Sequence, residues 1–326
     1  MKKEACPYCG SEKQKLFMTT KDWNWDTSGV FCLVRCEICS LVFLSPAPDV
    51  DELKTYYPKN YYTRASGLVE LTEEMFRSLE RGYSYRLKFI RKFQNPGRVL
   101  DVGCGDGHFL NFLKVRRWDT WGVEMSEMAC GYAVEKLGLE KDKIVCSDFM
   151  AVNLPEKYFD LVTINDVLEH LSEPVKILER CFQLLKLGGG IYIQVPNFNS
   201  LGRRIFGSHW IHIDAPRHQI HFTSKTLNRF LKDWKIMGET TRTNFGQAYV
   251  SGYSDSFRYW LVGRGLYSYQ KKSEEKLHSK ESNAKFGFSM KKAHVFAERF
   301  FFKFLGVLSD MCRQGEILQV YARRRL

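Results

Sequence analysis

Short apolar runs alternate with segments of helical period along the chain, and this alternation predicts an α/β fold. Apolar side chains recur at helical spacing over residues 68–93, up to a break at Asn95-Pro96-Gly97. Largely apolar runs of the length of a strand follow this helix. The runs expected to form strands are residues 98–102, 120–124, 191–195, 234–243 and 316–321. The chain is therefore expected to form a sheet covered by helices.

The pattern divides the chain into three parts. Residues 1–45 hold two short expected strands between cysteine pairs, and residues 46–95 form a linker and a helical approach segment. Residues 96–326 form the main domain, in which 201–326 are a C-terminal part carrying a helical insertion at 251–312. The linker contains a tyrosine-rich turn whose side chains either line a substrate entrance or pack the first part onto its neighbour. These tyrosines are Tyr56, Tyr57, Tyr61 and Tyr62.

Charge is unevenly distributed along the chain. The 326 residues have a formal net charge of +12, yet residues 1–200 hold 26 Lys and Arg against 27 Asp and Glu. Residues 201–326 hold 23 against 10. This asymmetry argues against a uniformly basic nucleic-acid coat protein and predicts a local electropositive surface. No apolar run approaches the roughly 18 residues of a membrane span, and the N-terminus does not read as a signal peptide.

Two Cys-x-x-Cys pairs predict a metal site in the first part of the chain. Cys6, Cys9, Cys36 and Cys39 can direct four thiolates at one ion, as in a structural zinc ribbon. The alternatives are two disulfides or a redox motif. Residues 1–45 hold six basic and five acidic side chains, and this near-neutral charge argues against nucleic-acid contact and favours a stabilising role. The other cysteines are scattered at apolar positions, which is typical of a reducing compartment and predicts a cytoplasmic protein.

A glycine-rich loop follows the first expected strand of the main domain. Asp101-Val-Gly103-Cys-Gly105-Asp-Gly107 leads directly into a helix, and a second strand ends in Glu124. Such a loop lets the backbone approach a ligand closely, and the acid suits the two hydroxyls of a ribose. A nicotinamide-binding fold would instead require G-x-G-x-x-G.

Residues 99–107 resemble the first motif of the class I S-adenosylmethionine-dependent methyltransferases, and ordered similarities continue to residue 196. The resemblance implies a Rossmann-like, doubly wound, seven-stranded sheet and an S-adenosylmethionine cofactor. Gly103 and Gly105 would lie under its methionyl part, and Asp101 would order the amino group. The other implied contacts are Glu124 with the ribose, Met125, Asp148 and Phe149 with the adenine, and Asn165 with the methionyl end.

Candidate acceptor-side groups cluster at two places. Asp166, Glu169 and His170 are spaced to share one face of a helical turn, and His218 lies in a second, histidine-rich segment. This set is similar to that of metal-assisted 2′-O-methyltransferases and ubiquinone-pathway O-methyltransferases, which implies a Mg²⁺ ion that polarises a hydroxyl. The alternatives for these catalytic candidates are His170 or His218 acting alone as a general base, or a structural role in which Glu169 and His170 orient the loop.

The stretch from Trp210 to Thr223, with the N-terminal ribbon, resembles a bacterial subgroup associated with sugar, polysaccharide and secondary-metabolite tailoring. We therefore expect methylation, preferably on oxygen, of an anionic sugar-type small molecule. Arg203, Arg204 and Arg217 are the candidates for a phosphate clamp. An RNA methyltransferase and a non-catalytic cofactor-binding protein are the alternatives.

An apolar helix expected at residues 291–311 leaves the question of a membrane open. Its apolar side chains cover most of its circumference, with basic residues on the remainder. Such a helix lies on the inner membrane surface, in peripheral contact with a lipid-linked substrate, or packs on the core or on a partner.

Overall fold

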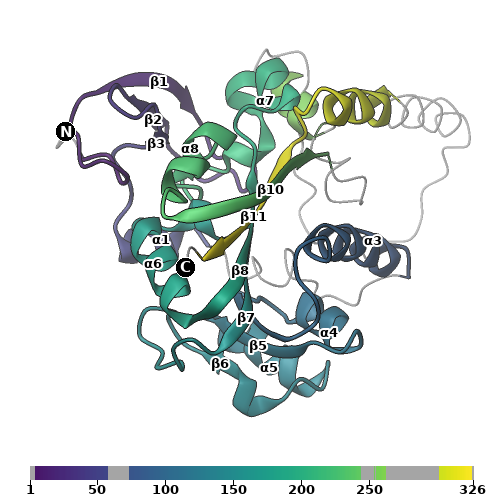
Figure 1. The fold of residues 1–326 in the computed structure, drawn as a ribbon. Coiled ribbons are helices and arrows are strands. Elements are labelled where there is room, and N and C mark those ends of the chain that lie inside the picture. The colour runs from purple at the N-terminus through teal and green to yellow at the C-terminus, as the bar shows by residue number, and fades with distance from the viewer. Residues whose placement is uncertain (1–3, 58–72, 244–252, 254, 262–300, 325–326) are drawn as a thin grey trace, which may run out of the picture.

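The computed structural model describes residues 4–57, 73–243, 253, 255–261 and 301–324 (Figure 1). They form a large sheet with helices on both faces and a smaller sheet at the N-terminal end. Within these ranges no helix combines the length and the apolar character needed to cross a bilayer. The seven strands of the large sheet confirm the expected Rossmann-like α/β architecture.

The large sheet is mixed. Five neighbouring strands run parallel, and β11 pairs antiparallel with both β8 and β10 at one edge. The spatial order is β10 (Trp234–Arg242), β11 (Ile317–Arg324), β8 (Leu185–Pro196), β7 (Phe159–Asn165), β4 (Arg98–Val102), β5 (Asp119–Glu124) and β6 (Ile144–Cys146). Successive strands β5 and β6 are added on one side of β4, whereas β7 and β8 are added on its other side. The carboxyl ends of the strands at this change of side are where such sheets bind ligands.

Successive side chains of each central strand enter different cores. Val99 and Leu161 pack under α3 and α4, whereas Leu100 and Val162 pack under α6 and α8. Because both faces are covered, these strands are apolar throughout. The α-helices that precede residue 234 in the described part of the chain are α1 (Val50–Thr55), α3 (Glu73–Ile90), α4 (His108–Lys114), α5 (Glu127–Glu135), α6 (Pro174–Leu184), α7 (Leu201–Phe206) and α8 (Ser224–Phe230).

Helix boundaries follow local capping chemistry. The Asp49 carboxylate accepts from the amides of Asp51 and Glu52 at the start of α1. Thr223, rather than Ser224, caps α8 and forms a reciprocal capping box with Thr226. Residues 301–311 are helical, as expected, while residues 291–300 of that predicted helix and most of the insertion lie outside the described part of the chain.

The smaller sheet contains one strand that is remote in sequence. β1 (Gln14–Thr20), β2 (Phe31–Cys36) and β3 (Val42–Leu44) are antiparallel neighbours, close to the strands expected between the cysteine pairs. Its fourth strand, β9 (Ile220–His221), comes from the histidine-rich segment of the C-terminal part. The cysteine-bearing part is thus joined to the main domain by backbone pairing.

Candidate active site

The glycine-rich loop leaves β4 at the carboxyl edge of the sheet. The amides of Gly103 and Cys104 both donate to the carbonyl oxygen of Val123, which ties the loop to β5. Gly103 and Gly105 have left-handed backbones, with φ of +70° and +54°. A Cβ on Gly103 would lie 2.5 Å from Cγ2 of Val167, whereas one on Gly105 would meet no atom within 4 Å. The chain therefore fills one side of the loop and leaves the Gly105 side open to a ligand.

Replacing either glycine by alanine should separate packing from ligand binding. Gly103→Ala meets Val167 and should lower the free energy of unfolding by several kcal/mol. Gly105→Ala adds backbone strain of about 1–2 kcal/mol, but its methyl group enters the open space, so S-adenosylmethionine affinity should fall about 100-fold. Urea unfolding and titration calorimetry measure the two effects.

Gly131→Ala is the matched control for these variants. Gly131 lies inside α5, and its added methyl group would also meet no atom within 4 Å. This change should stabilise the protein by up to about 1 kcal/mol and leave cofactor affinity unchanged. Normal cofactor affinity in Gly105→Ala would show that the open side of the loop is not the binding side.

Glu124 lies under the loop at the end of β5. Its carboxylate accepts from the amide of Gly105 at 3.0 Å and from the amide of Ser126 at 2.9 Å. Each carboxylate oxygen has a further acceptor position, so the predicted contact with two ribose hydroxyls remains chemically available. The next side chain, Met125, is 66% exposed, so its thioether is accessible to an adenine ring.

Asp101 is a buried residue of β4, just before the glycine-rich loop. Its carboxylate accepts from the Thr163 hydroxyl at 2.6 Å and from the Asn165 side-chain amide at 2.9 Å. Burial raises the pKa of Asp101 to about 7, although these two hydrogen bonds oppose the rise. Asn165 Oδ1 is buried without a hydrogen-bond partner. An ammonium group such as that of a methionyl end would satisfy this oxygen, so these residues fit the expected cofactor.

The turn after β6 lies beside Glu124, because the amide of Ser147 donates to the Glu124 carbonyl oxygen at 2.9 Å. The Asp148 carboxylate accepts from the Met150 amide at 2.8 Å, which shapes the turn. Phe149 is buried in the core beneath it. The structure thus gathers the predicted cofactor residues at the carboxyl ends of β4, β5, β6 and β7, while their individual contacts with adenine stay predictions.

The buried Glu169 and His218 and the half-buried His170 form a cluster beyond the loop. One ligand-type atom from each lies within 4.8 Å of the others, and the two imidazole centroids are 4.5 Å apart. Val167, which lies next to Gly103, precedes Glu169 by two residues and His170 by three. The predicted acceptor-side residues from the two segments are therefore together, next to the glycine loop.

Hydrogen bonds orient the two imidazoles. His218 Nδ1 lies 2.9 Å from the carbonyl oxygen of His212, so Nδ1 carries the proton and Nε2 keeps its lone pair. His170 Nδ1 lies 3.1 Å from the carbonyl oxygen of Arg217 and from the hydroxyl of Tyr57. Burial lowers the pKa of both histidines, strongly so for His218. Both rings are therefore neutral near pH 7, as a general base must be.

Glu169 is the least satisfied group of the cluster. It is 1% exposed, and neither carboxyl oxygen has a hydrogen-bond partner. Burial, followed by the negative charges of Asp166 and Asp214, raises its pKa well above the usual range. Glu169 Oε1 and His218 Nε2 are 3.9 Å apart, too far for a direct hydrogen bond, so a cation or a polar ligand group between them would satisfy both.

Asp166 does not share the face of Glu169 and His170, contrary to expectation. Its backbone is left-handed, with φ of +54°, and only Leu168–His170 are helical, as a single 3-10 turn. The Asp166 carboxylate instead accepts from Gln194 at 2.8 Å and from Arg86 of α3 at 3.3 Å. The predicted four-residue Mg²⁺ set is thus reduced to three of its members.

The prediction that Arg217 belongs to a phosphate clamp is wrong. Its side chain is fully buried and ion-paired with Asp22 and Asp214, so it offers no donor to a ligand at the surface. Arg86 and Asp214 are site residues that the sequence did not reveal, whereas Tyr57, one of the tyrosines expected at a substrate entrance or in packing, lies 3.1 Å from His170 Nδ1. The one signal available for Asp214 was its spacing from Arg217 and His218, because side chains three and four residues apart in a helical turn can contact one another.

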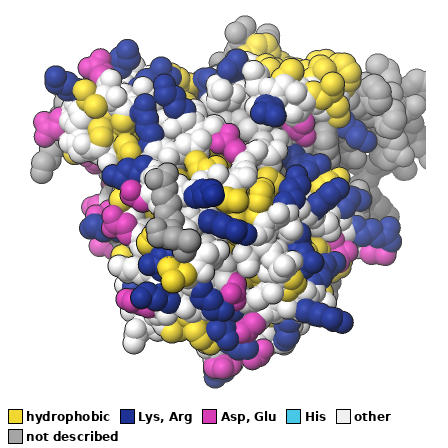
Figure 2. Space-filling view, in the orientation of Figure 1, with side chains coloured by type: hydrophobic (Ala, Val, Ile, Leu, Met, Phe, Trp, Pro, Cys, Tyr) yellow, Lys and Arg dark blue, Asp and Glu magenta, His cyan; other side chains and the backbone are white. Residues whose placement is uncertain are grey.

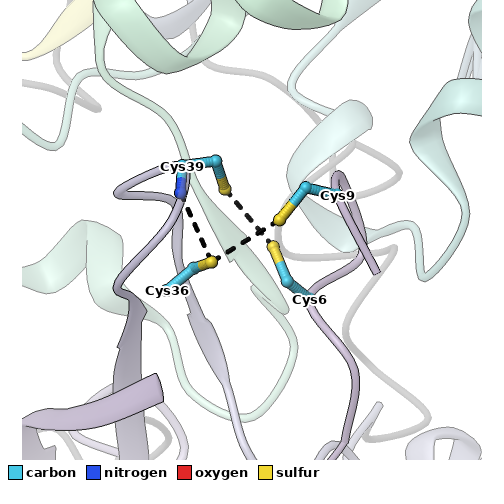
Figure 3. Close-up of side chains that lie close together, drawn as sticks. All are labelled: Cys6, Cys9, Cys36 and Cys39. Carbon is cyan, nitrogen blue, oxygen red and sulfur yellow. Dashed lines mark hydrogen bonds between the residues drawn. The ribbon is translucent and has the colours of Figure 1, made fainter. Parts of the chain in front are cut away.

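The four N-terminal cysteines converge on one point (Figure 3). Sγ of Cys6 is 3.5 Å from that of Cys39, and Sγ of Cys9 is 3.6 Å from that of Cys36. A tetrahedral zinc ion with bonds of about 2.3 Å holds its sulfurs about 3.8 Å apart, so the donor set fits. Gly10, which follows the first pair, has a left-handed backbone with φ of +70°. All ten cysteines are free thiols.

Comparison with known proteins bears on the same residues. A family model described as a methyltransferase domain matches residues 71–234, about half of the chain. An uncharacterized methyltransferase of Schizosaccharomyces pombe is 29% identical over 191 residues, 54% of this chain and 67% of that protein. A ubiquinone biosynthesis O-methyltransferase of Pseudomonas savastanoi pv. phaseolicola is 32% identical over 107 residues, 31% of this chain and 45% of its own length.

Among solved structures, the (4+2)-cyclase SpnF aligns with a TM-score of 0.52 and 16% identity, over 86% of this chain and 97% of that one. This likeness concerns the fold. The match to the ubiquinone biosynthesis enzyme spans less than half of that relative's length.

Proposed function

The chain belongs to the S-adenosylmethionine-dependent methyltransferase family, and from that premise we propose that it methylates an oxygen of a small-molecule acceptor, most suitably a sugar or a polysaccharide or glycolipid precursor. The observation that carries the proposal is the cluster of Glu169, His170 and His218 beside the glycine loop. Oxygen acceptors need a base, and this cluster provides one.

In the proposed reaction the bound cofactor supplies an electrophilic methyl group. His218 Nε2, which keeps its lone pair because Nδ1 donates to a carbonyl, takes the proton of the acceptor hydroxyl. The imidazolium formed is stabilised by the Asp214 carboxylate, whose Oδ2 lies 3.9 Å from Nε2. Asp214 is ionised for this purpose: burial opposes ionisation, but His218 and Arg217 lower its pKa to about 2. His170 packs edge-on against His218 and fixes the plane of its ring.

A divalent cation is the second way in which the same cluster could activate a hydroxyl. The orphaned Glu169 carboxylate and the two imidazoles are a suitable donor set, although imidazoles suit transition metals better than Mg²⁺. The loss of Asp166 from the set weakens the Mg²⁺ alternative.

Support for the class of acceptor comes from charge and from the relatives. Figure 2 shows Lys and Arg side chains across the face that carries β10 and β11, consistent with the excess of basic residues after residue 200. Anionic acceptors such as sugar phosphates suit this surface. The printed name of the Pseudomonas relative, a ubiquinone biosynthesis O-methyltransferase, favours a small molecule methylated on oxygen.

RNA is the weaker alternative. The first argument against RNA is that the cysteine-bearing part is nearly neutral. The second is that Asn197, which follows β8, is buried and hydrogen-bonded within the chain. Its side chain donates to the Gly315 carbonyl oxygen at 2.8 Å and accepts from the Asn199 amide at 3.0 Å. It is therefore unsuited to hold the exocyclic amine of a flipped base.

We also propose a structural zinc ion at the four cysteines and a reducing compartment, the cytoplasm, as the place of action. Peripheral membrane contact is an extension of the same proposal. Phe301, Phe304 and Met311 are 56%, 56% and 77% exposed along one side of the helix at 301–311, where Figure 2 shows apolar side chains at the top of the molecule. A lipid-linked acceptor would be reached from such a face.

The proposal is tested by incubating the protein and methyl-labelled S-adenosylmethionine with fractionated extract of its host. We expect label in the small-molecule or glycolipid fraction, stable to mild base treatment as an ether is. Label mainly in RNA would overturn the acceptor class. Tight cofactor binding without label in any fraction would favour a non-catalytic cofactor-binding protein.

A further inference from the structure

Arg217 is a buried cation held between two parts of the chain. Its guanidinium lies 2.6 Å from Asp22 Oδ1 and 2.7 Å from Asp214 Oδ1, and it also donates to the carbonyl oxygen of Tyr56 at 3.1 Å. The side chains of Arg217 and Asp22 are both 0% exposed. A charge removed from water to this extent requires its partners, because a single unpaired member would be strongly destabilised.

The two carboxylates have different origins. Asp214 is three residues before Arg217, and its Oδ2 faces His218 Nε2 at 3.9 Å. Asp22 follows β1, in the cysteine-bearing part of the chain, and contacts Arg217 through a fork of two hydrogen bonds of 2.6 and 3.0 Å. Asp22 thus supplies from outside the main domain the second negative charge that a buried guanidinium needs.

Neighbours of Asp22 hold the same segment. The Thr20 hydroxyl and the Trp23 indole both donate to the carbonyl oxygen of Ser208, at 2.7 and 3.1 Å. The Asn24 amide donates to Asp214 Oδ1 at 2.5 Å and to the carbonyl oxygen of Ile211 at 3.1 Å. Residues 20–24 are therefore hydrogen-bonded to the segment from Ser208 to Asp214 at several points.

Backbone hydrogen bonds extend this connection from the cysteine-bearing part to Glu169. The Leu44 amide of β3 donates to the carbonyl oxygen of Gln219 at 2.8 Å, and the Gln219 amide donates to the carbonyl oxygen of Glu169 at 2.8 Å. Gln219 is next to His218. A continuous set of hydrogen bonds therefore runs from the cysteine-bearing sheet through the residue beside His218 to Glu169.

We propose that the cysteine-bearing part of the chain positions the acceptor-side histidines, and that Asp22 and Arg217 are positioning residues of the methyl-transfer site. This inference rests on the proposed function, since it assigns His218 to the acceptor. Asp22 keeps Arg217 in place, and Arg217 in turn donates to both carboxylate oxygens of Asp214, so that Oδ2, at 3.1 Å from Arg217 Nε, is held facing His218. Without Asp22, Arg217 and Asp214 rearrange around each other, and the ring of His218 moves.

The test compares Asp22→Asn with Asp26→Asn. Asp26 is an exposed acid in the same loop, with a left-handed backbone that asparagine tolerates. We expect Asp22→Asn to lower kcat about 10- to 100-fold, as a small misplacement of a reacting group does, with cofactor affinity and bound zinc unchanged. Rates are expressed per cofactor-binding site, so a loss of folded protein does not count. Asp26→Asn should match the wild type.

A second readout does not depend on turnover. The imidazole Cε1 resonances of His218 and His170, assigned with the glutamine variants, should shift in Asp22→Asn and stay in place in Asp26→Asn. Unshifted resonances together with a wild-type kcat would overturn the positioning role. If Asp22→Asn does not fold, Asn24→Ala removes a hydrogen bond to Asp214 instead, and the same shifts are expected. If no acceptor is ever methylated, the proposed function fails while the resonances still decide the positioning.

Discussion

His218→Gln is expected to lower the rate of methyl transfer about 100- to 10,000-fold while leaving cofactor affinity within a factor of two. Glutamine can keep the hydrogen bond to the His212 carbonyl oxygen, but it has no basic nitrogen at the position of Nε2. The predicted cofactor residues lie at the ends of β4 to β7, and the loop residue Gly103 lies next to Val167, so we expect the cofactor contacts to be unaffected. Single-turnover rates with labelled cofactor, together with calorimetric cofactor binding, measure the two quantities.

His209→Gln is the control, because His209 belongs to the same segment but packs on Trp23 outside the cluster. Its rate should equal that of the wild type. A double His170→Gln/His218→Gln variant that keeps normal turnover would remove the catalytic assignment altogether. A wild-type rate that rises steeply with added millimolar Mg²⁺ would favour the cation over the base.

Cys36→Ser is expected to abolish zinc binding and to lower the free energy of unfolding by at least about 3 kcal/mol. In small peptides the binding of a structural zinc ion contributes about 10–16 kcal/mol to folding. We expect a smaller loss here, because the cysteine-bearing sheet is also held by its packing on the core. The sulfur lost is a buried one that accepts from the Cys39 amide at 3.4 Å. Metal content by plasma mass spectrometry and urea unfolding give the two values.

Cys32→Ser provides the comparison within the same strand. Cys32 lies in β2 but is not one of the four converging cysteines, so this variant should keep one zinc ion per chain. Full stability of Cys36→Ser after exhaustive removal of metal would contradict a structural role for the ion.

Sequence patterns located the elements of the main domain because their signals are local. The strand Arg98–Val102 and its glycine loop are where the pattern places them, since an apolar run that turns sharply into a helix needs no distant partner to be identified. The two late strands, β10 and β11, were found for the same reason. The cysteine pairs also came together as expected, because their ligand chemistry leaves few alternatives.

Features that depend on remote partners escaped prediction. Arg217 reads as a surface cation until Asp22, far away in sequence, is known to bury it. Asp166 was assigned to a helical face, but its left-handed backbone abolishes the spacing rule on which that assignment rests. β9 is two residues long, too short for any period to show, and only its pairing with β3 makes it a strand.

The shared sheet of β1, β2, β3 and β9 has a consequence for evolution and engineering. A domain joined to its neighbour by a simple linker can be exchanged between homologues as a unit. Here the first 45 residues and the segment around His218 carry the two halves of one interface, so each constrains the substitutions the other tolerates. Chimaeras that exchange residues 1–45 alone should fold poorly, and those that also carry residues 208–221 from the same parent should recover. Acceptor preference would then be inherited with the N-terminal residues as well as with the C-terminal ones.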